Sequence, residues 1–214
     1  CNLFLADELN RATSRTQSAL LEAMEEGQVT VDGVSHPVPR PFIVIATQNP
    51  AGASGTQLLP DSQMDRFMVR LSIGYPAAAD EVELLRRKQG GSLLERVGVV
   101  LSRGELLALQ EQVERVYIAD EVLDYIVRLT GATRKSPLIE QGASPRASLA
   151  VAAMARAAAF LQGRDYVLPE NVAAVFADTV AHRLLLSPRA EEMEGGREAL
   201  LDKLLRATPM PRIR

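Results

Sequence analysis

An acidic pair, Asp7 and Glu8, follows directly after a short apolar run from Leu3 to Ala6. A continuous apolar run of this length is typical of a strand that is covered on both faces, so the two carboxylates are expected at its carboxyl end. There Asp7 could help to hold Mg²⁺, and Glu8 could orient and activate a water molecule against a terminal phosphate. The pattern indicates phosphoryl transfer, although a solvated or helix-capping acidic pair would look the same.

Two arginines, Arg66 and Arg146, stand where a positive charge could bind a phosphate or serve only a structural purpose. Arg66 stands near Asp61 and Asp65 and can be read as a surface side chain that pairs with one of them. Arg146 lies in the first turn of a helix expected to begin after Ser144. A cation there is unfavourable by about a few tenths of a kcal/mol, so either a nearby anion explains it or the side chain is simply solvated.

The first part of the chain predicts strands and one helix. After the strand at residues 3–6, Ser14 and Gln17 match a capping box for a helix to Glu26, which Gly27 ends. Alternation on both sides of Asp32-Gly33 predicts a β-hairpin over residues 28–38. A second buried strand is expected over residues 42–47, a short helix that begins with Pro60, and a third strand over residues 67–73.

After residues 74–79 the pattern becomes helical. Asp80, Ser102 and Asp120 are plausible N-caps, and Ser102 forms a capping box with Glu105. Further helices are expected from Pro145 to about residue 163, from Pro169, and over residues 196–206. We therefore predict an α/β piece at residues 1–76 and an all-helical piece at residues 77–214.

Composition excludes several classes of protein. The 214 residues include 24 basic and 27 acidic side chains, so the net charge of -3 gives no reason to expect nucleic acid as the main partner. No apolar run reaches the roughly 20 residues that a membrane span needs, and no signal peptide is evident. A single cysteine fits a reducing cytoplasm. His36 and His182 lie far apart without cysteine partners, so zinc spacing is absent.

Four segments together resemble the MoxR family of AAA+ ATPases. They are residues 3–33 (LFLADELNRATSRTQSALLEAMEEGQVTVDG), 45–50 (IATQNP), 58–71 (LLPDSQMDRFMVRL) and 142–147 (GASPRA). Separated motifs in the right order are far more specific than any one alone. The resemblance implies a fold in the α/β class, a partial P-loop core with a parallel sheet from the Walker B strand onward, followed by an all-α lid domain.

The resemblance also assigns roles to residues. Asp7 and Glu8 resemble the Walker B pair, with Asp7 near Mg²⁺ and Glu8 as the catalytic base. Asn49 resembles the sensor 1 residue that helps to place the attacking water, although an Asn before Pro is also ordinary turn chemistry. Arg66 resembles the arginine finger that reaches the next subunit's nucleotide, and Arg146 resembles sensor 2. We expect Asp7, Asn49 and Arg146 to converge on one triphosphate.

Family membership would further imply ATP and Mg²⁺ as cofactors and a homo-oligomeric ring, expected to be a hexamer. It would imply chaperone-like remodelling or maturation of client proteins, sometimes metal-cofactor insertion, with a von Willebrand factor A domain protein as co-chaperone. The hairpin resembles the one that faces the ring's channel. Arg11 could pair with Glu8 or contact a neighbouring subunit, and Arg70 could assist catalysis or be solvated.

The sequence departs from the family in one respect. No G-x-x-x-x-G-K-[ST] motif occurs, although such ATPases bind phosphates with that loop. The expected strand order is five, one, four, three, two, and only strands three, four and five are present. Strand five, at residues 67–73, should therefore lack its neighbour. We expect this chain to be the carboxyl-terminal part of a longer polypeptide and to be inactive as an ATPase alone.

Two other functions stay open. The chain could be a non-catalytic protein-interaction module derived from a AAA+ protein, and Glu8→Gln in the complete protein would separate this from a motor. A nucleic-acid motor would also use a hairpin, but here the hairpin carries Asp32 and His36 and no Lys. Strongly salt-dependent DNA binding would favour that function.

Overall fold

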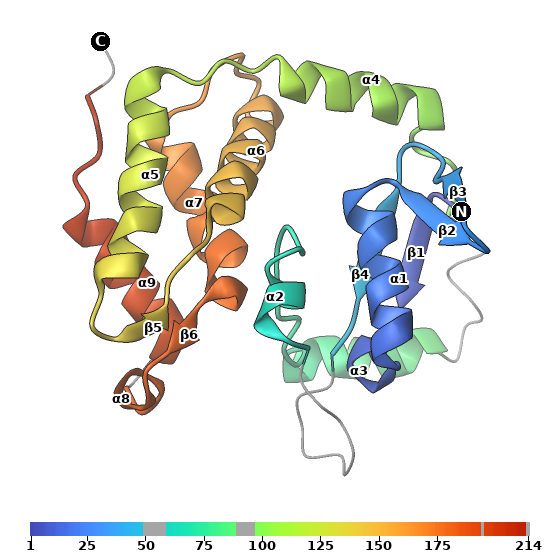
Figure 1. The fold of residues 1–214 in the computed structure, drawn as a ribbon, viewed down its shortest axis with the longest axis horizontal. Coiled ribbons are helices and arrows are strands. Elements are labelled where there is room, and N and C mark those ends of the chain that lie inside the picture. The colour runs from blue at the N-terminus through green and yellow to red at the C-terminus, as the bar shows by residue number, and fades with distance from the viewer. Residues whose placement is uncertain (49–58, 89–96, 194, 213–214) are drawn as a thin grey trace.

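The computed structural model describes residues 1–48, 59–88, 97–193 and 195–212. The first part contains β1 (Leu3–Ala6), η1 (Leu9–Arg11), α1 (Ser14–Glu25), β2 (Gln28–Val31), β3 (Val34–Pro37), β4 (Ile43–Ala46) and α2 (Asp61–Met64). It continues with α3 (Ala78–Lys88), α4 (Arg103–Glu114), α5 (Asp120–Lys135), β5 (Ile139–Gln141), α6 (Pro145–Leu161), α7 (Pro169–Val180), η3 (Ala181–Arg183), β6 (Leu185–Leu186), α8 (Pro188–Glu191) and α9 (Gly196–Ala207). In Figure 1, α2 lies between α1 and the bundle that α5, α6, α7 and α9 form.

The strand that precedes the acidic pair is β1, and β4 pairs with it in parallel. Leu3 lies opposite Ile43, and Ala6 lies opposite Ala46. This register confirms the expected adjacency of the first two apolar runs. It also brings the carboxyl ends of the two strands, and the polar residues that follow them, to the same edge.

One face of this two-stranded sheet is uncovered. Leu3, Leu5, Ile43 and Ile45 alternate onto it and expose between 43% and 63% of their surface. On the opposite face, Ala6, Val44 and Ala46 pack against a small core that includes residues of η1 and α1. The expectation of strands covered on both faces is therefore wrong, because α1 covers one face and no described element packs on the other.

The third predicted strand does not form. Residues 67–73 contain no regular element, and Leu71 and Ile73 expose 72% and 100% of their surface. The Arg70 N–H donates instead to the Asp178 carbonyl oxygen of α7, at 3.0 Å. An alternating pattern becomes a strand only where a neighbour supplies backbone partners, and no such neighbour exists among the described residues.

Helix α1 forms over nearly the predicted range, but its cap differs. Thr13 is the N-cap and its hydroxyl accepts from the Thr16 N–H, whereas the Gln17 amide donates to the carbonyl oxygens of Leu9 and Ala12. The predicted capping box of Ser14 and Gln17 is therefore wrong. Gln17 is drawn inward because it satisfies the carbonyl groups of the buried turn before the helix.

The hairpin is confirmed. Strands β2 and β3 pair in antiparallel register, with Gln28 opposite Pro37 and Val31 opposite Val34. Asp32 and Gly33 both have positive φ, 51° and 79°, as the favoured two-residue turn requires. Val31 and Val34 expose more than half of their surface beside this turn.

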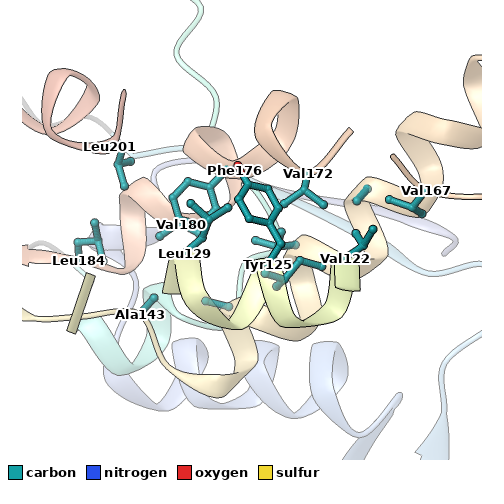
Figure 2. Packing of buried hydrophobic residues seen from close by; sticks show 14 of the residues in the cluster. Val122, Tyr125, Leu129, Ala143, Val167, Val172, Phe176, Val180, Leu184 and Leu201 are labelled. Atoms are coloured by element: carbon teal, nitrogen blue, oxygen red, sulfur yellow. The ribbon is translucent and has the colours of Figure 1, made fainter. Parts of the chain in front are cut away.

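The helical part has the larger core. Figure 2 shows its centre, where Tyr125 and Leu129 of α5 meet Phe176 of α7. The predicted starts at Ser102, Ser144-Pro145 and Pro169 are confirmed, and α9 lies within one residue of its predicted range. Three start predictions are wrong by one or more residues: Asp80 and Asp120 lie inside the first turns of α3 and α5, and Pro60 is the N-cap rather than the first residue of α2.

Candidate functional site

The acidic pair lies where β1 and β4 end together, at Thr47. The Thr47 hydroxyl donates to Asp7 Oδ1 at 2.5 Å and accepts from the Glu8 N–H at 2.8 Å. Asp7 and Thr47 are exposed, and Glu8 is half-buried. We call Asp7, Glu8 and Thr47 the acidic edge. Thr47 was not singled out from the sequence, although a hydroxyl that ends the neighbouring strand was a usable signal.

Glu8 has an unusual backbone. Its φ of 49° and ψ of 46° lie in the left-handed region, which costs a residue of this type about 1–2 kcal/mol. Arg11 Nη1 lies 2.9 Å from Glu8 Oε2, so of the two partners left open for Arg11 the structure shows Glu8. Backbone strain of this kind concentrates at functional sites, which favours a role for Glu8 beyond folding.

Three side-chain amides, those of Asn10, Gln48 and Asn49, lie near the acidic edge in the sequence. Asn49 lies outside the described residues, so its role as a water-placing residue stays a prediction. Its neighbour Gln48 directs its side-chain nitrogen to the Met64 sulfur at 3.5 Å. Asn10 of η1 is 5% exposed, and neither atom of its amide has a hydrogen-bond partner in the described structure. An unpartnered buried amide costs about 1–3 kcal/mol, so this edge carries a second local penalty.

The two candidate arginines meet at one carboxylate. Arg66 Nη1 pairs with Glu25 Oε2, and Arg146 Nη2 lies 2.6 Å from Glu25 Oε1. Arg66 does not pair with Asp61 or Asp65, the partners that its sequence neighbourhood suggested. Glu25 is the last residue of α1, and we call Glu25, Arg66 and Arg146 the basic cluster. Its two guanidinium groups come from different parts of the chain, one after α2 and one in α6.

A buried ion pair adjoins the basic cluster. Arg183, whose side chain is 2% exposed, donates to Asp65 Oδ1 at 2.9 Å, and the Ser144 hydroxyl donates to the same carboxylate at 2.9 and 3.1 Å. Burial lowers the pKa of Arg183, while the hydrogen bond and charge of Asp65 oppose that shift. This pair could not be predicted from the sequence, because Asp65 and Arg183 lie 118 positions apart.

A cavity of about 250 Å³ opens beside these side chains. Its charged and hydroxyl-bearing lining consists of Arg66, Arg146, Arg183, Ser62 and Ser144 together with the carboxylates of Asp61 and Asp65. Three guanidinium groups therefore border one hollow, and two of them share Glu25 as their counter-charge. An anion that entered this hollow would compete with Glu25 for Arg66 and Arg146, which is the chemistry expected of side chains that bind phosphate.

The acidic edge and the basic cluster lie at opposite ends of α1. The acidic edge is next to the start of this helix, because the Leu9 N–H donates to the Thr47 carbonyl oxygen at 3.0 Å and Gln17 holds the same turn. Glu25 is eleven residues beyond Ser14, which corresponds to about 16 Å along a helix. The structure therefore does not bring Arg146 to Asp7, as convergence on one triphosphate within a chain would require.

Two family models match this chain. A model described as the ATPase family associated with various cellular activities (AAA) matches residues 1–69, and a model of the AAA lid domain matches residues 131–204. Chaperone MoxR1 of Mycobacterium tuberculosis is 40% identical over 99% of this chain. Protein MoxR of Paracoccus denitrificans is 31% identical over 98% of it. This chain belongs to the MoxR family of AAA+ ATPases.

The same similarity extends to the fold. A crystal structure of a protein from Cytophaga hutchinsonii matches 99% of this MoxR chain with a TM-score of 0.91 at 35% sequence identity. The predicted fold class, a AAA+ parallel-sheet core followed by a helical lid, is thereby confirmed. The MoxR chain spans 58% of MoxR1 and 67% of both the Paracoccus protein and the Cytophaga chain. The division at residues 76 and 77 stays a prediction.

The AAA+ ATPases use a nucleotide with Mg²⁺, and the acidic edge of this MoxR chain fits one side of such a site. Mg²⁺ is held through one or two carboxylates together with phosphates and water, and the exposed Asp7 offers such a carboxylate. The described residues contain no group of three or more His, Cys, Asp or Glu side chains suited to a metal ion. None of the described helices is long and apolar enough to cross a membrane.

Proposed function

We propose that this MoxR chain is part of a ring that hydrolyses ATP at the contacts between neighbouring chains. One chain contributes its acidic edge to a nucleotide site, and the next chain contributes its basic cluster. The single observation that supports this arrangement is the separation of the two groups by the length of α1. Groups at opposite ends of a helix cannot contact the same phosphate within one chain, whereas two chains can bring them together.

In this proposal each residue has one task. Asp7 holds Mg²⁺, which when bound lowers the negative charge on the phosphates. Glu8 accepts a proton from the attacking water, and Asn49 orients that water. Arg66 donates to the phosphate on which charge develops, an interaction worth roughly 10³- to 10⁵-fold in rate in other phosphoryl-transfer enzymes. Arg146 binds the phosphates of the neighbouring chain rather than those of its own, which revises the convergence expected from the sequence.

For the whole protein we propose a hexameric ring that remodels or matures client proteins. Support comes from a relative that is named a chaperone. The hairpin offers a surface for clients, because Val31 and Val34 are exposed at its tip. A von Willebrand factor A domain co-chaperone and metal-cofactor insertion are the finer parts of this proposal, and they follow from the family resemblance.

The 214 residues contain no phosphate-binding loop motif. We therefore propose that the chain alone neither binds ATP at micromolar concentration nor hydrolyses it. The same observation favours the second candidate function, a non-catalytic interaction module. Isothermal titration of the chain with ATP and Mg²⁺ tests the first statement, and micromolar binding with turnover would contradict it.

The motor is tested in a polypeptide that joins this chain to a phosphate-binding segment of the MoxR family. In that polypeptide Glu8→Gln should lower kcat by about 10²- to 10⁴-fold, because a general base is lost. Nucleotide affinity should be retained. Glu26→Gln is the matched control, since Glu26 is an exposed carboxylate that forms no ion pair in the described structure. Full turnover by Glu8→Gln would show that Glu8 is not the general base, whereas a joined polypeptide that does not hydrolyse ATP even with Glu8 in place would leave the interaction module as the better function.

Subunit mixing tests the site between chains. Glu8→Gln and Arg66→Ala rings should each lose most of their activity and keep only a small residual turnover. Rings assembled from a mixture should regain part of the activity, because an Arg66→Ala chain still supplies Glu8 and its Glu8→Gln neighbour still supplies Arg66. A site that took both residues from one chain would show no such recovery.

A further inference from the structure

Arg183 donates to the carbonyl oxygens of the two residues on either side of Arg66. Its Nη1 donates to the Asp65 carbonyl oxygen at 2.6 Å, and its Nη2 donates to the Phe67 carbonyl oxygen at 2.7 Å. Its Nε donates to the Thr179 carbonyl oxygen of α7 at 2.9 Å. With the Asp65 carboxylate included, four of the five guanidinium N–H groups are used. The lid thus holds the backbone that carries Arg66.

Other lid groups strengthen the same contact. The His182 Nε2 lies 2.9 Å from the Phe67 carbonyl oxygen, and the Arg70 N–H donates to the Asp178 carbonyl oxygen at 3.0 Å. These bonds replace the strand that the sequence predicted after Phe67. The segment that carries Arg66 is therefore fixed by the helical lid rather than by a sheet.

Stability alone does not explain a charge in this place. A buried ion pair costs several kcal/mol of desolvation for each ion, and apolar residues of similar volume often serve folding equally well. A forked guanidinium, however, can bind two carbonyl groups and a carboxylate at fixed angles, which no apolar side chain can do. The geometry is suited to setting the direction of a backbone segment.

We propose that Arg183 is a positioning residue for Arg66, through which the lid directs Arg66 toward the adjoining chain. This inference rests on the proposed function, in which Arg66 completes the neighbour's site. Arg183 itself touches no nucleotide in this arrangement. It acts by holding the carbonyl groups of Asp65 and Phe67, and loss of its fork would let Arg66 move out of line with the phosphate.

The test uses the same joined polypeptide as above. Arg183→Lys keeps the charge but loses the fork, since a single ammonium cannot span both carbonyl groups. We expect kcat to fall by up to about 100-fold, as for a misplacement of about 1 Å, with little change in the KM for ATP. In an Arg66→Ala background the same substitution should cause no further loss. Arg206→Lys in α9, an exposed lid arginine, is the control.

The outcomes separate the two proposals. If Arg66→Ala leaves turnover intact, the proposed site between chains fails, and this inference fails with it. If Arg66→Ala lowers turnover strongly while Arg183→Lys has no effect, or lowers the residual turnover of Arg66→Ala by the same factor as that of the unchanged protein, only the inference is wrong. Should Arg183→Lys not fold, Ser144→Ala decides, because it removes one donor to Asp65 and should lower kcat a few-fold only when Arg66 is present.

Discussion

Glu25 and Arg146 form an ion pair of 2.6 Å that joins the last residue of α1 to the first turn of α6. Neither side chain is at the end of a helix that favours its charge. A carboxylate is unfavourable at a carboxyl end, and a guanidinium is unfavourable at an amino end. The pair is therefore explained by the mutual contact, together with Arg66, and not by local helix chemistry.

Removal of this carboxylate should weaken the packing of the lid on the core. Glu25→Gln leaves Arg66 and Arg146 without their counter-charge, and we expect the free energy of unfolding to fall by about 1 kcal/mol at low salt, because the three side chains are partly exposed. Urea denaturation measures the change. Glu26→Gln, one position later, should change stability by much less, and equal losses from the two variants would contradict the assignment.

The stability of the chain should decrease on acidification because of His182. Burial lowers the pKa of His182 below 6.5, the Phe67 carbonyl contact and Asp65 oppose this shift, and the charges of Arg183 and Arg70 add to it. The unfolded chain therefore takes up a proton near pH 6.5 that the folded chain does not, so stability is complete above that pH and falls below it.

Urea unfolding at pH 7.5 and 5.5 measures this effect. His182→Asn should lose less stability between the two pH values than the unchanged chain loses. His36→Asn is the matched control, because it removes an exposed imidazole on β3 by the same substitution. An identical loss in all three proteins would show that His182 is not the group responsible.

Tyr125 offers a stabilising substitution. Its ring is fully buried in the lid core of Figure 2, and its hydroxyl has no hydrogen-bond partner within the described structure. Tyr125→Phe removes a desolvated polar group and should raise the free energy of unfolding by about 1 kcal/mol. Tyr117→Phe, at a 65% exposed position, should have little effect. A loss of stability in Tyr125→Phe would mean that the hydroxyl is bonded.

The acidic edge was predictable because it depends on local patterns. An apolar run predicts a strand, parallel strands share one edge, and the residues that follow them must meet, as Asp7 and Thr47 do. The hairpin was predictable for the same reason, since Asp32-Gly33 determines its own turn.

The basic cluster was not predictable from local patterns. Glu25 and Glu26 look equivalent at the end of α1, and only the positions of Arg66 and Arg146 in the fold select Glu25. The segment after Phe67 has the alternation of a strand, but the contacts of Arg183 and Asp178 determine its path. The cap of α1 differed from the prediction because two adjacent hydroxyl groups, those of Thr13 and Ser14, could serve as the N-cap.

The length of α1 has a consequence for how this chain can vary. One inserted residue would turn Glu25 by about 100° and advance it by about 1.5 Å relative to Asp7. In the proposed ring the two ends of the helix contribute to different nucleotide sites, so such a change would alter the position of one contribution relative to the other. Substitutions on the outer surface of α1 should be tolerated far more readily than a change in its number of residues.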